Sequence, residues 1–261
     1  AHPYPAPHVA GSLVSVSVEV DGAAVPLYTS RDHADRLYLE ARKGAAYSIR
    51  LANRSHERVA VAVTVDGLNV ISAQRETLAP AGVAARPGRM YVLDPWSDTV
   101  IRGWRTSLEE VRRFTFVDEQ RSYATRSGKA NAQMGWIEVA AYRERHPRPA
   151  PVVRAPRESD GDREAAGAPA ARDEAKSKAE PAAPGARAQG FPGTGWGDRT
   201  ADPVVVVDFE PQAYAAERVT LRYEYASGLR ALGIFPTPRH ADRLQQRERG
   251  DGGGFAPPPR W

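Results

Sequence analysis

The stretch YSIRLANRSHERVAVAVTVDGLNVI (residues 47–71) decides the fold class of this chain. Apolar and polar residues alternate over residues 47–51, and valines recur at every second position over residues 59–65. Alternation with a period of two is typical of β-strands that bury one face. The stretch therefore predicts a hairpin of two strands with a polar turn at residues 53–57. A sharp bend follows at Asp66 and Gly67, a dipeptide typical of tight turns.

The same pattern recurs on both sides of this stretch. Small residues opposite the valines of 59–65 indicate that the second face of that strand is also covered, as in the inner sheet of a sandwich. Further strands are expected at residues 13–20, 37–39, 91–93, 99–101, 113–117 and 136–142. One short helix is expected at 106–113, where acidic residues follow Thr106 and Ser107. Short strands separated by Gly, Pro, Asn and Asp predict a mostly β protein, an antiparallel β-sandwich.

Composition divides the chain into five parts. Residues 1–11 form a Pro-rich extended leader, and residues 12–143 form the β-sandwich domain. Residues 144–190 lack aromatic residues and almost all large apolar ones, so they cannot bury enough surface to offset their ordering entropy. We therefore expect a disordered linker there. Residues 191–249 form a short β-containing tail, and residues 250–261 a disordered end.

The tail is expected to depend on other surfaces for its folding. Strands are predicted at residues 204–209 (VVVVDF) and 218–225, whereas the glycine-rich residues 193–197 (GTGWG) read as a flexible turn. This segment is too small to build a core of its own. We expect its strands to dock on the first domain or on a partner.

The composition and net charge of the chain exclude several classes of protein. The 261 residues are 41% hydrophobic and 26% charged, which is ordinary for a globular protein, and they include no cysteine. Disulfides, iron–sulfur clusters, thiolate zinc sites and cysteine nucleophiles are therefore excluded. The net charge is +4, with arginines scattered among acidic residues, which argues against nucleic acid as a partner. No apolar run is long enough to span a membrane.

Metal and catalytic signatures are weak. The six histidines lie in loops or charged stretches without ligand spacing, so no metal and no cofactor is expected. Asp66, Asp94 and Asp98 could form a carboxylate set for acid–base chemistry or calcium. However, Asp66-Gly67 and Asp94-Pro95 are dipeptides typical of turns, which favours a structural interpretation. No G-x-S-x-G nucleophile motif occurs.

A set of aromatic and arginine residues offers the best candidate binding surface. Flat rings beside guanidinium groups suit a sugar or a protein surface. The candidates are Trp96, Trp104, Arg105, Tyr123 and Arg126. The alternative for Trp104, and for the nearby Trp136, is burial in the core, which is commoner for tryptophan.

Four segments carry a resemblance to a family. They are VDGLNVIS (65–72), YVLDPWSDTVIRGWR (91–105), FTFVDEQRSYATRSGK (114–129) and MGWIEVAAY (134–142). They resemble an uncharacterised family of bacterial secreted and phage-borne β-domains, with a VDGL(N/S)V motif and a YVLDP…IxGW segment. Trp136 departs from the smaller apolar residue that the family has at that position. The resemblance implies an exported or virion-surface β-domain and assigns no catalytic residue.

These observations favour a non-enzymatic function. The leading hypothesis is an exported structural or interaction module, periplasmic, cell-surface or extracellular, that assembles with itself. The first strand could pair with a neighbouring subunit, although pairing within its own sheet is favoured. The chain begins at Ala1, as after signal-peptide cleavage, which agrees with export. The alternative is a module that binds polysaccharide or the cell envelope, and the third hypothesis is a hydrolase that uses carboxylates.

Overall fold

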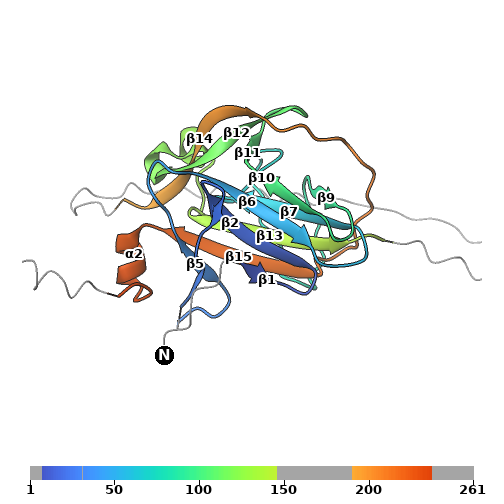
Figure 1. Cartoon of the computed structure of the whole chain (residues 1–261), viewed down its shortest axis with the longest axis horizontal. Helices are drawn as coiled ribbons and strands as arrows, with labels where there is room; N and C mark the ends of the chain where they lie inside the picture. The colour runs from blue at the N-terminus through green and yellow to red at the C-terminus, as the bar shows by residue number, and fades with distance from the viewer. Residues whose placement is uncertain (1–7, 31, 146–189, 237–261) are drawn as a thin grey trace, which may run out of the picture. The chain divides into compact units, whose positions relative to one another are not determined.

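The computed structural model describes residues 8–30, 32–145 and 190–236. In these residues the chain is mostly β, and its strands form two sheets that pack against each other (Figure 1). The predicted antiparallel β-sandwich is confirmed, with one parallel strand pair as an exception. The predictions for residues 1–7, 146–189 and 237–261, the end of the predicted tail included, lie outside the described residues. Within those that are described, no helix is long and apolar enough to cross a membrane.

The first sheet is built around β6 and β12. Its strands are β1 (Val9–Ala10), β2 (Val14–Val20), β3 (Ala23–Ala24), β6 (Ala46–Asn53), β10 (Asp98–Ile101), β11 (Gly103–Arg105), β12 (Glu110–Asp118) and β14 (Pro192–Ala201). β6 pairs with β2 along one edge and with β10 and β12 along the other. β14 pairs with β12 along its length, with a register shift between Arg112 and Phe114. The first long strand, β2, is thus paired within its own chain.

The second sheet is built around β13. Its strands are β4 (Tyr28–Thr29), β5 (Leu37–Glu40), β7 (Val59–Val65), β8 (Leu68–Asn69), β9 (Tyr91–Leu93), β13 (Trp136–Arg143) and β15 (Glu217–Glu224). β13 lies between β7 and β15, and β15 pairs in parallel with β5 on its other side. The tail therefore supplies one strand to each sheet.

The hairpin predicted for residues 47–65 is wrong, although its two strands exist. β6 belongs to the first sheet and β7 to the second, so the turn between them carries the chain across the sandwich. The Asn53 side chain holds this crossing, because its amide nitrogen donates to the carbonyls of Glu57 and Asp94 at 2.7 and 3.0 Å. Alternation of apolar and polar residues cannot distinguish two strands that pair in one sheet from two that face each other across a sandwich.

A true hairpin follows β7. Val65 pairs with Leu68, and the two residues between them have φ angles of 52° (Asp66) and 70° (Gly67). Positive φ at both central residues is the geometry of a type I′ turn, which matches the twist of antiparallel strands. This turn brings the Asp66 side chain into the protein interior.

Three segments differ from their predicted structure. Residues 106–109 form a turn that leads into β12, so the predicted helix is absent. The glycine-rich segment 193–197 lies inside β14, because β12 pairs with its residues 193–196. The valine-rich segment 204–209 is extended but belongs to no strand among the described residues. The short helices are η1 (Glu119–Arg121), α1 (Tyr123–Arg126) and α2 (Ala226–Ala231).

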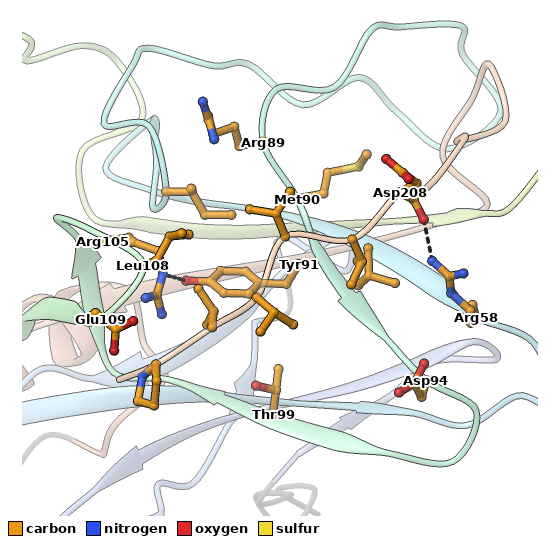
Figure 2. A pocket seen from close by; sticks show the side chains of 17 residues that line it. Arg58, Arg89, Met90, Tyr91, Asp94, Thr99, Arg105, Leu108, Glu109 and Asp208 are labelled. Carbon is orange, nitrogen blue, oxygen red and sulfur yellow. Dashed lines mark hydrogen bonds between the residues drawn. The ribbon is translucent and has the colours of Figure 1, made fainter. Parts of the chain in front are cut away.

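One open side of the sandwich is crossed by residues 203–208, here called the valine strap. β9 and β10 lie at this side, and the Asp94 to Ser97 turn connects them from the second sheet to the first. The strap follows β14 and passes over Tyr91 of β9 (Figure 2). An open groove of about 1010 Å³ lies between the strap and these two strands.

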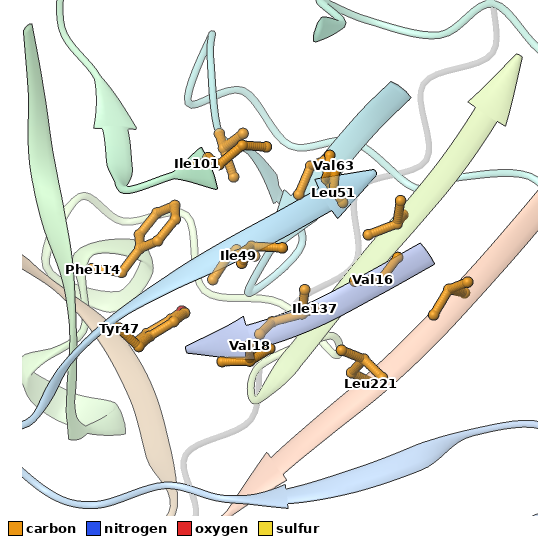
Figure 3. Packing of buried hydrophobic residues seen from close by; sticks show 14 of the residues in the cluster. Val16, Val18, Tyr47, Ile49, Leu51, Val63, Ile101, Phe114, Ile137 and Leu221 are labelled. Atoms are coloured by element: carbon orange, nitrogen blue, oxygen red, sulfur yellow. The ribbon is translucent and has the colours of Figure 1, made fainter. Parts of the chain in front are cut away.

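The core consists of the inward rows of both sheets. Residues of β2 and β6 from the first sheet face those of β7, β13 and β15 from the second (Figure 3). The outer face of β7 is also buried, because Leu78, Met90 and Ala215 cover Ala62. This agrees with the small residues that alternate with the valines in the sequence.

Candidate functional site

The predicted aromatic set is dispersed in the structure. Trp96 lies in the β9–β10 turn with φ 57° and is 70% exposed. Trp104 is buried, donates its indole N–H to the carbonyl of Gly195 at 3.1 Å, and packs edge-to-face on Phe114. Trp104 is therefore a core residue. Trp136 is half-buried, with the guanidinium of Arg36 4.8 Å from its ring centroid.

Arg105 holds the valine strap in place. Its side chain is nearly buried, and its guanidinium pairs with the carboxylate of Asp202 and donates to the Asp202 carbonyl at 2.8 Å. It also donates to the hydroxyl of Tyr91 at 3.1 Å (Figure 2). Burial raises the pKa of this phenol. Arg105 was predicted as a binding residue, and the structure assigns its hydrogen-bonding groups to an anchoring role.

The strap is also held at its other end. The guanidinium of Arg58 donates to the carbonyl of Asp208 at 2.7 Å (Figure 2). It also lies over the ring of Phe209. The amide of Arg145 donates to the carbonyl of Glu210 at 2.7 Å. Between these anchors, the amide of Val204 donates to the carbonyl of Leu108. The strap is therefore tethered at both ends.

The middle of the strap exposes apolar side chains and unpaired backbone. Val205 is 83% exposed, Val206 is 78% exposed, and Val207 is half exposed. Within the described part of the chain, the amides and carbonyls of these three valines have no hydrogen-bond partner. β-branched residues are strongly enriched in paired strands. The strap thus has the composition and extended form of a strand, but no described strand pairs with its three central valines.

A second surface feature lies on β14 and α1. The rings of Tyr123 and Trp196 are 4.5 Å apart between centroids and inclined by 34°. Arg121, Arg126 and Ser127 complete a shallow cleft of about 330 Å³, here called the aromatic cleft. The structure thus brings together two of the predicted residues, Tyr123 and Arg126. The sequence does not predict a role for Trp196, because its flanking glycines favour a turn.

The third feature is a buried network at Asp66. Its carboxylate accepts hydrogen bonds from the amides of Gly135 and Thr194, each at 2.8 Å, and from the hydroxyl of Tyr223. The Thr194 hydroxyl in turn lies 2.6 Å from the Tyr47 hydroxyl. Burial raises the pKa of Asp66 to about 6, although each of the three donors lowers it. Burial also raises the pKa of both phenols.

The three aspartates considered as one carboxylate set lie apart. Asp66 follows one end of β7, whereas Asp94 follows Leu93, which pairs with Val59 at the other end. At ~3.3 Å per strand residue, the two ends of β7 are separated by roughly 20 Å. Asp98 forms an ion pair with Arg50 on β6. A shared site for Asp66 and Asp94 is therefore excluded.

Side chains that could bind a metal ion are not grouped together in the described residues. In the described part of the chain, no group of three or more His, Asp or Glu side chains is arranged to hold a metal ion. Asp94 and Pro95 begin the β9–β10 turn, where the Asp94 carbonyl accepts hydrogen bonds from Ser97 at 2.8 and 3.2 Å.

The valine strap and the aromatic cleft remain as exposed candidates for binding. No protein-family model, no curated protein and no solved structure matches this chain.

Proposed function

We propose that this protein is a non-enzymatic interaction module that assembles with a second copy of itself through the valine strap. The observation that carries the proposal is the exposure of Val205, Val206 and Val207 on an extended backbone that no described residue pairs. Exposed apolar patches on a folded domain mark interaction sites. An extended segment with free amides and carbonyls accepts another strand by β-addition.

The chemistry of the strap favours a second copy as the partner. An antiparallel pair of identical strands is related by a two-fold axis, so the same surface serves both copies. In a register centred on Val206, each Asp208 lies opposite Val204 of the other copy. A parallel pair would set the two aspartates side by side, where like charges oppose each other. We therefore propose an antiparallel arrangement.

The tethering of the strap lowers the entropic cost of pairing. Asp202 and Asp208 are fixed by Arg105 and Arg58, so the three valines are already extended before a partner arrives. Burial of each valine contributes about 1.5 kcal/mol or more. A stable interface buries about 800 Å² on each partner, which is more than a strap of this length provides. The proposal therefore predicts a weak dimer, extended by the half-exposed Leu108 beside the strap.

Sedimentation velocity of the full chain over a wide range of concentrations tests this proposal. We expect a reversible dimer whose fraction rises with concentration. Val206→Lys should give a monomer, because the two lysines meet at the two-fold axis. Val83→Lys is the matched control, since Val83 is 49% exposed in the loop between β8 and β9, outside the strap. This variant should dimerise like the unmodified chain.

A charge-reversal pair makes the test specific to the strap. Val206→Glu alone should also be monomeric, but a mixture of Val206→Lys with Val206→Glu should restore the dimer, because the opposite charges then face each other. A chain that stays monomeric at every concentration contradicts the proposal. So does a dimer that Val206→Lys leaves intact.

A further inference from the structure

The aromatic cleft is built on a rigid support. Trp196 lies opposite Phe114 in the ladder between β14 and β12, and the ring of Tyr123 rests against it. Beneath Tyr123 lies the buried Trp104, whose ring centroid is 5.1 Å away and whose indole is fixed to Gly195. The outer ring, Trp196, remains 43% exposed. The cleft therefore presents a preformed aromatic face to solvent.

Two cations border this aromatic face. Arg121 ends η1 and Arg126 ends α1, and both side chains are exposed and line the cleft. None of the described side chains that line it is acidic. The nearby Asp118 is engaged with Lys43 and with the hydroxyl of Tyr225. The two guanidinium groups are thus available to an anionic ligand beside an aromatic ring.

We propose that the aromatic cleft binds an acidic saccharide, with a sugar ring stacked on Trp196 and a uronate carboxylate held by Arg121 and Arg126. Guanidinium groups bind carboxylates through charge-assisted, often paired hydrogen bonds. An aromatic face binds the apolar face of a sugar ring. The volume of about 330 Å³ is at the lower end of ligand pockets, which suits one or two sugar rings.

Single-stranded nucleic acid is a weaker match to the same residues. Its binding sites combine stacking rings with a basic groove that follows the phosphates of several nucleotides. Here the lining supplies only two cations, Arg121 and Arg126. Two cations match one uronate carboxylate on a stacked sugar better than a run of phosphates.

Isothermal titration of the full chain with an oligogalacturonate tests the proposal. The comparison ligand is the methyl-esterified oligomer, which keeps the sugar rings and removes the charge. We expect the ester to bind about tenfold more weakly, because its neutral carbonyls form no ion pair with the guanidinium groups. Arg126→Gln and Arg121→Gln should each weaken binding of the acid by about tenfold and weaken binding of the ester much less.

Matched controls separate this site from other exposed residues. Trp196→Ala should abolish binding, whereas Trp96→Ala, which removes a more exposed tryptophan, should not affect it. Arg86→Gln removes an exposed guanidinium from the 74–90 loop and should also have no effect. Arg126→Gln changes only an exposed side chain, so it tests the site even if Trp196→Ala lowers stability. Val206→Lys should bind the acid normally, because this site does not depend on the strap.

Three results would overturn the proposal. They are equal affinity for the acid and its ester, no binding of the acid at millimolar concentration, and acid binding that survives both Trp196→Ala and Arg126→Gln. Tighter binding of a short single-stranded DNA that is lost in Trp196→Ala would assign the cleft to nucleic acid instead.

Discussion

The hydroxyl of Tyr223 donates a hydrogen bond to the carboxylate of Asp66, which lies 157 residues earlier in the chain. Asp66 occupies the turn after β7, and Tyr223 lies on β15 of the same sheet. Thr194, on β14 of the other sheet, donates its amide to the same carboxylate. This one carboxylate therefore joins the two strands of the tail to the body of the sandwich.

The first prediction concerns Asp66→Asn. Asparagine tolerates the positive φ of this turn, so the backbone remains unstrained. However, its amide has one acceptor oxygen in place of two, and its NH₂ group faces buried N–H donors. We expect a loss of about 2 kcal/mol or more in the free energy of unfolding, measured by urea denaturation.

Asp21→Asn is the matched control for this change. Asp21 and Gly22 have φ angles of 53° and 77°, close to those of Asp66 and Gly67, but Asp21 is exposed. Its replacement should change the stability by less than about 0.5 kcal/mol. Equal effects of the two substitutions would show that the turn, and not the buried carboxylate, determines the loss.

The second prediction concerns pH. Burial raises the pKa of Asp66 from 3.8 to about 6, so the folded state binds a proton more tightly than the unfolded state. Protonation therefore stabilises the fold: this contribution is fully present below pH 3.8 and is lost as the pH rises through about 6. The size expected from the shift is about 3 kcal/mol.

Comparison with Asp66→Asn isolates this contribution from that of other carboxyl groups. The stability of the unmodified chain minus that of the variant should increase as the pH falls from 7 to 4. Urea denaturation at a series of pH values measures this difference. A difference that is constant or decreases on acidification would mean that the pKa of Asp66 is not raised.

The third prediction concerns Tyr223→Phe. The variant loses the hydroxyl that donates to Asp66 and that lies 2.8 Å from the Thr194 hydroxyl. Because this hydrogen bond lowers the pKa of Asp66, its removal should raise that pKa further. A carbon-13 NMR titration of the Asp66 carboxyl group measures the change. Tyr225→Phe is the control, because the Tyr225 hydroxyl donates to Asp118, and it should not move the pKa of Asp66.

Much of the fold follows from residue alternation. Valines at every second position predict β7, and the dipeptide Asp66-Gly67 predicts its turn. Alternation does not reveal which strands pair, so the assignment of β6 and β7 to different sheets was not predictable. The burial of Asp66 was not predictable either, since its partners Thr194 and Tyr223 are distant in sequence.

The two tail segments show how tertiary context overrides local propensity. The glycines around Trp196 favour a turn, yet β12 pairs with this segment and makes it a strand. Residues 204–209 have the strongest β-propensity in the tail but meet no partner strand among the described residues. Both candidate binding surfaces lie where the local prediction was wrong. A disagreement of this kind is expected at functional sites.

The fourth prediction concerns Gly103→Ala. A Cβ atom at Gly103 would lie 1.9 Å from the carbonyl oxygen of Arg112, which is backbone in the paired strand β12. Neither strand can move without breaking its ladder. We expect a loss of about 3 kcal/mol in the free energy of unfolding. Gly190→Ala is the control, because its nearest contact is the Asp118 carboxylate at 3.6 Å, and it should be nearly neutral.

The fifth prediction concerns a chain that ends at Arg145. Such a chain loses β14 and β15, so β13 loses its neighbour on one side and the aromatic core loses Tyr223. It also leaves the Asp66 carboxylate without the donors from Thr194 and Tyr223. We expect it to be unfolded, as judged by the absence of a cooperative thermal transition in circular dichroism.

Co-expression with residues 190–261 should restore a folded, non-covalent complex that co-purifies and melts cooperatively. The expectation rests on the ladders of β14 with β12 and of β15 with β13, which do not require the intervening chain to be continuous. Asp66→Asn in the first fragment should weaken this association, because the carboxylate of Asp66 accepts hydrogen bonds from both strands of the second fragment. A first fragment that folds cooperatively on its own would instead show that the tail is an accessory to a complete sandwich.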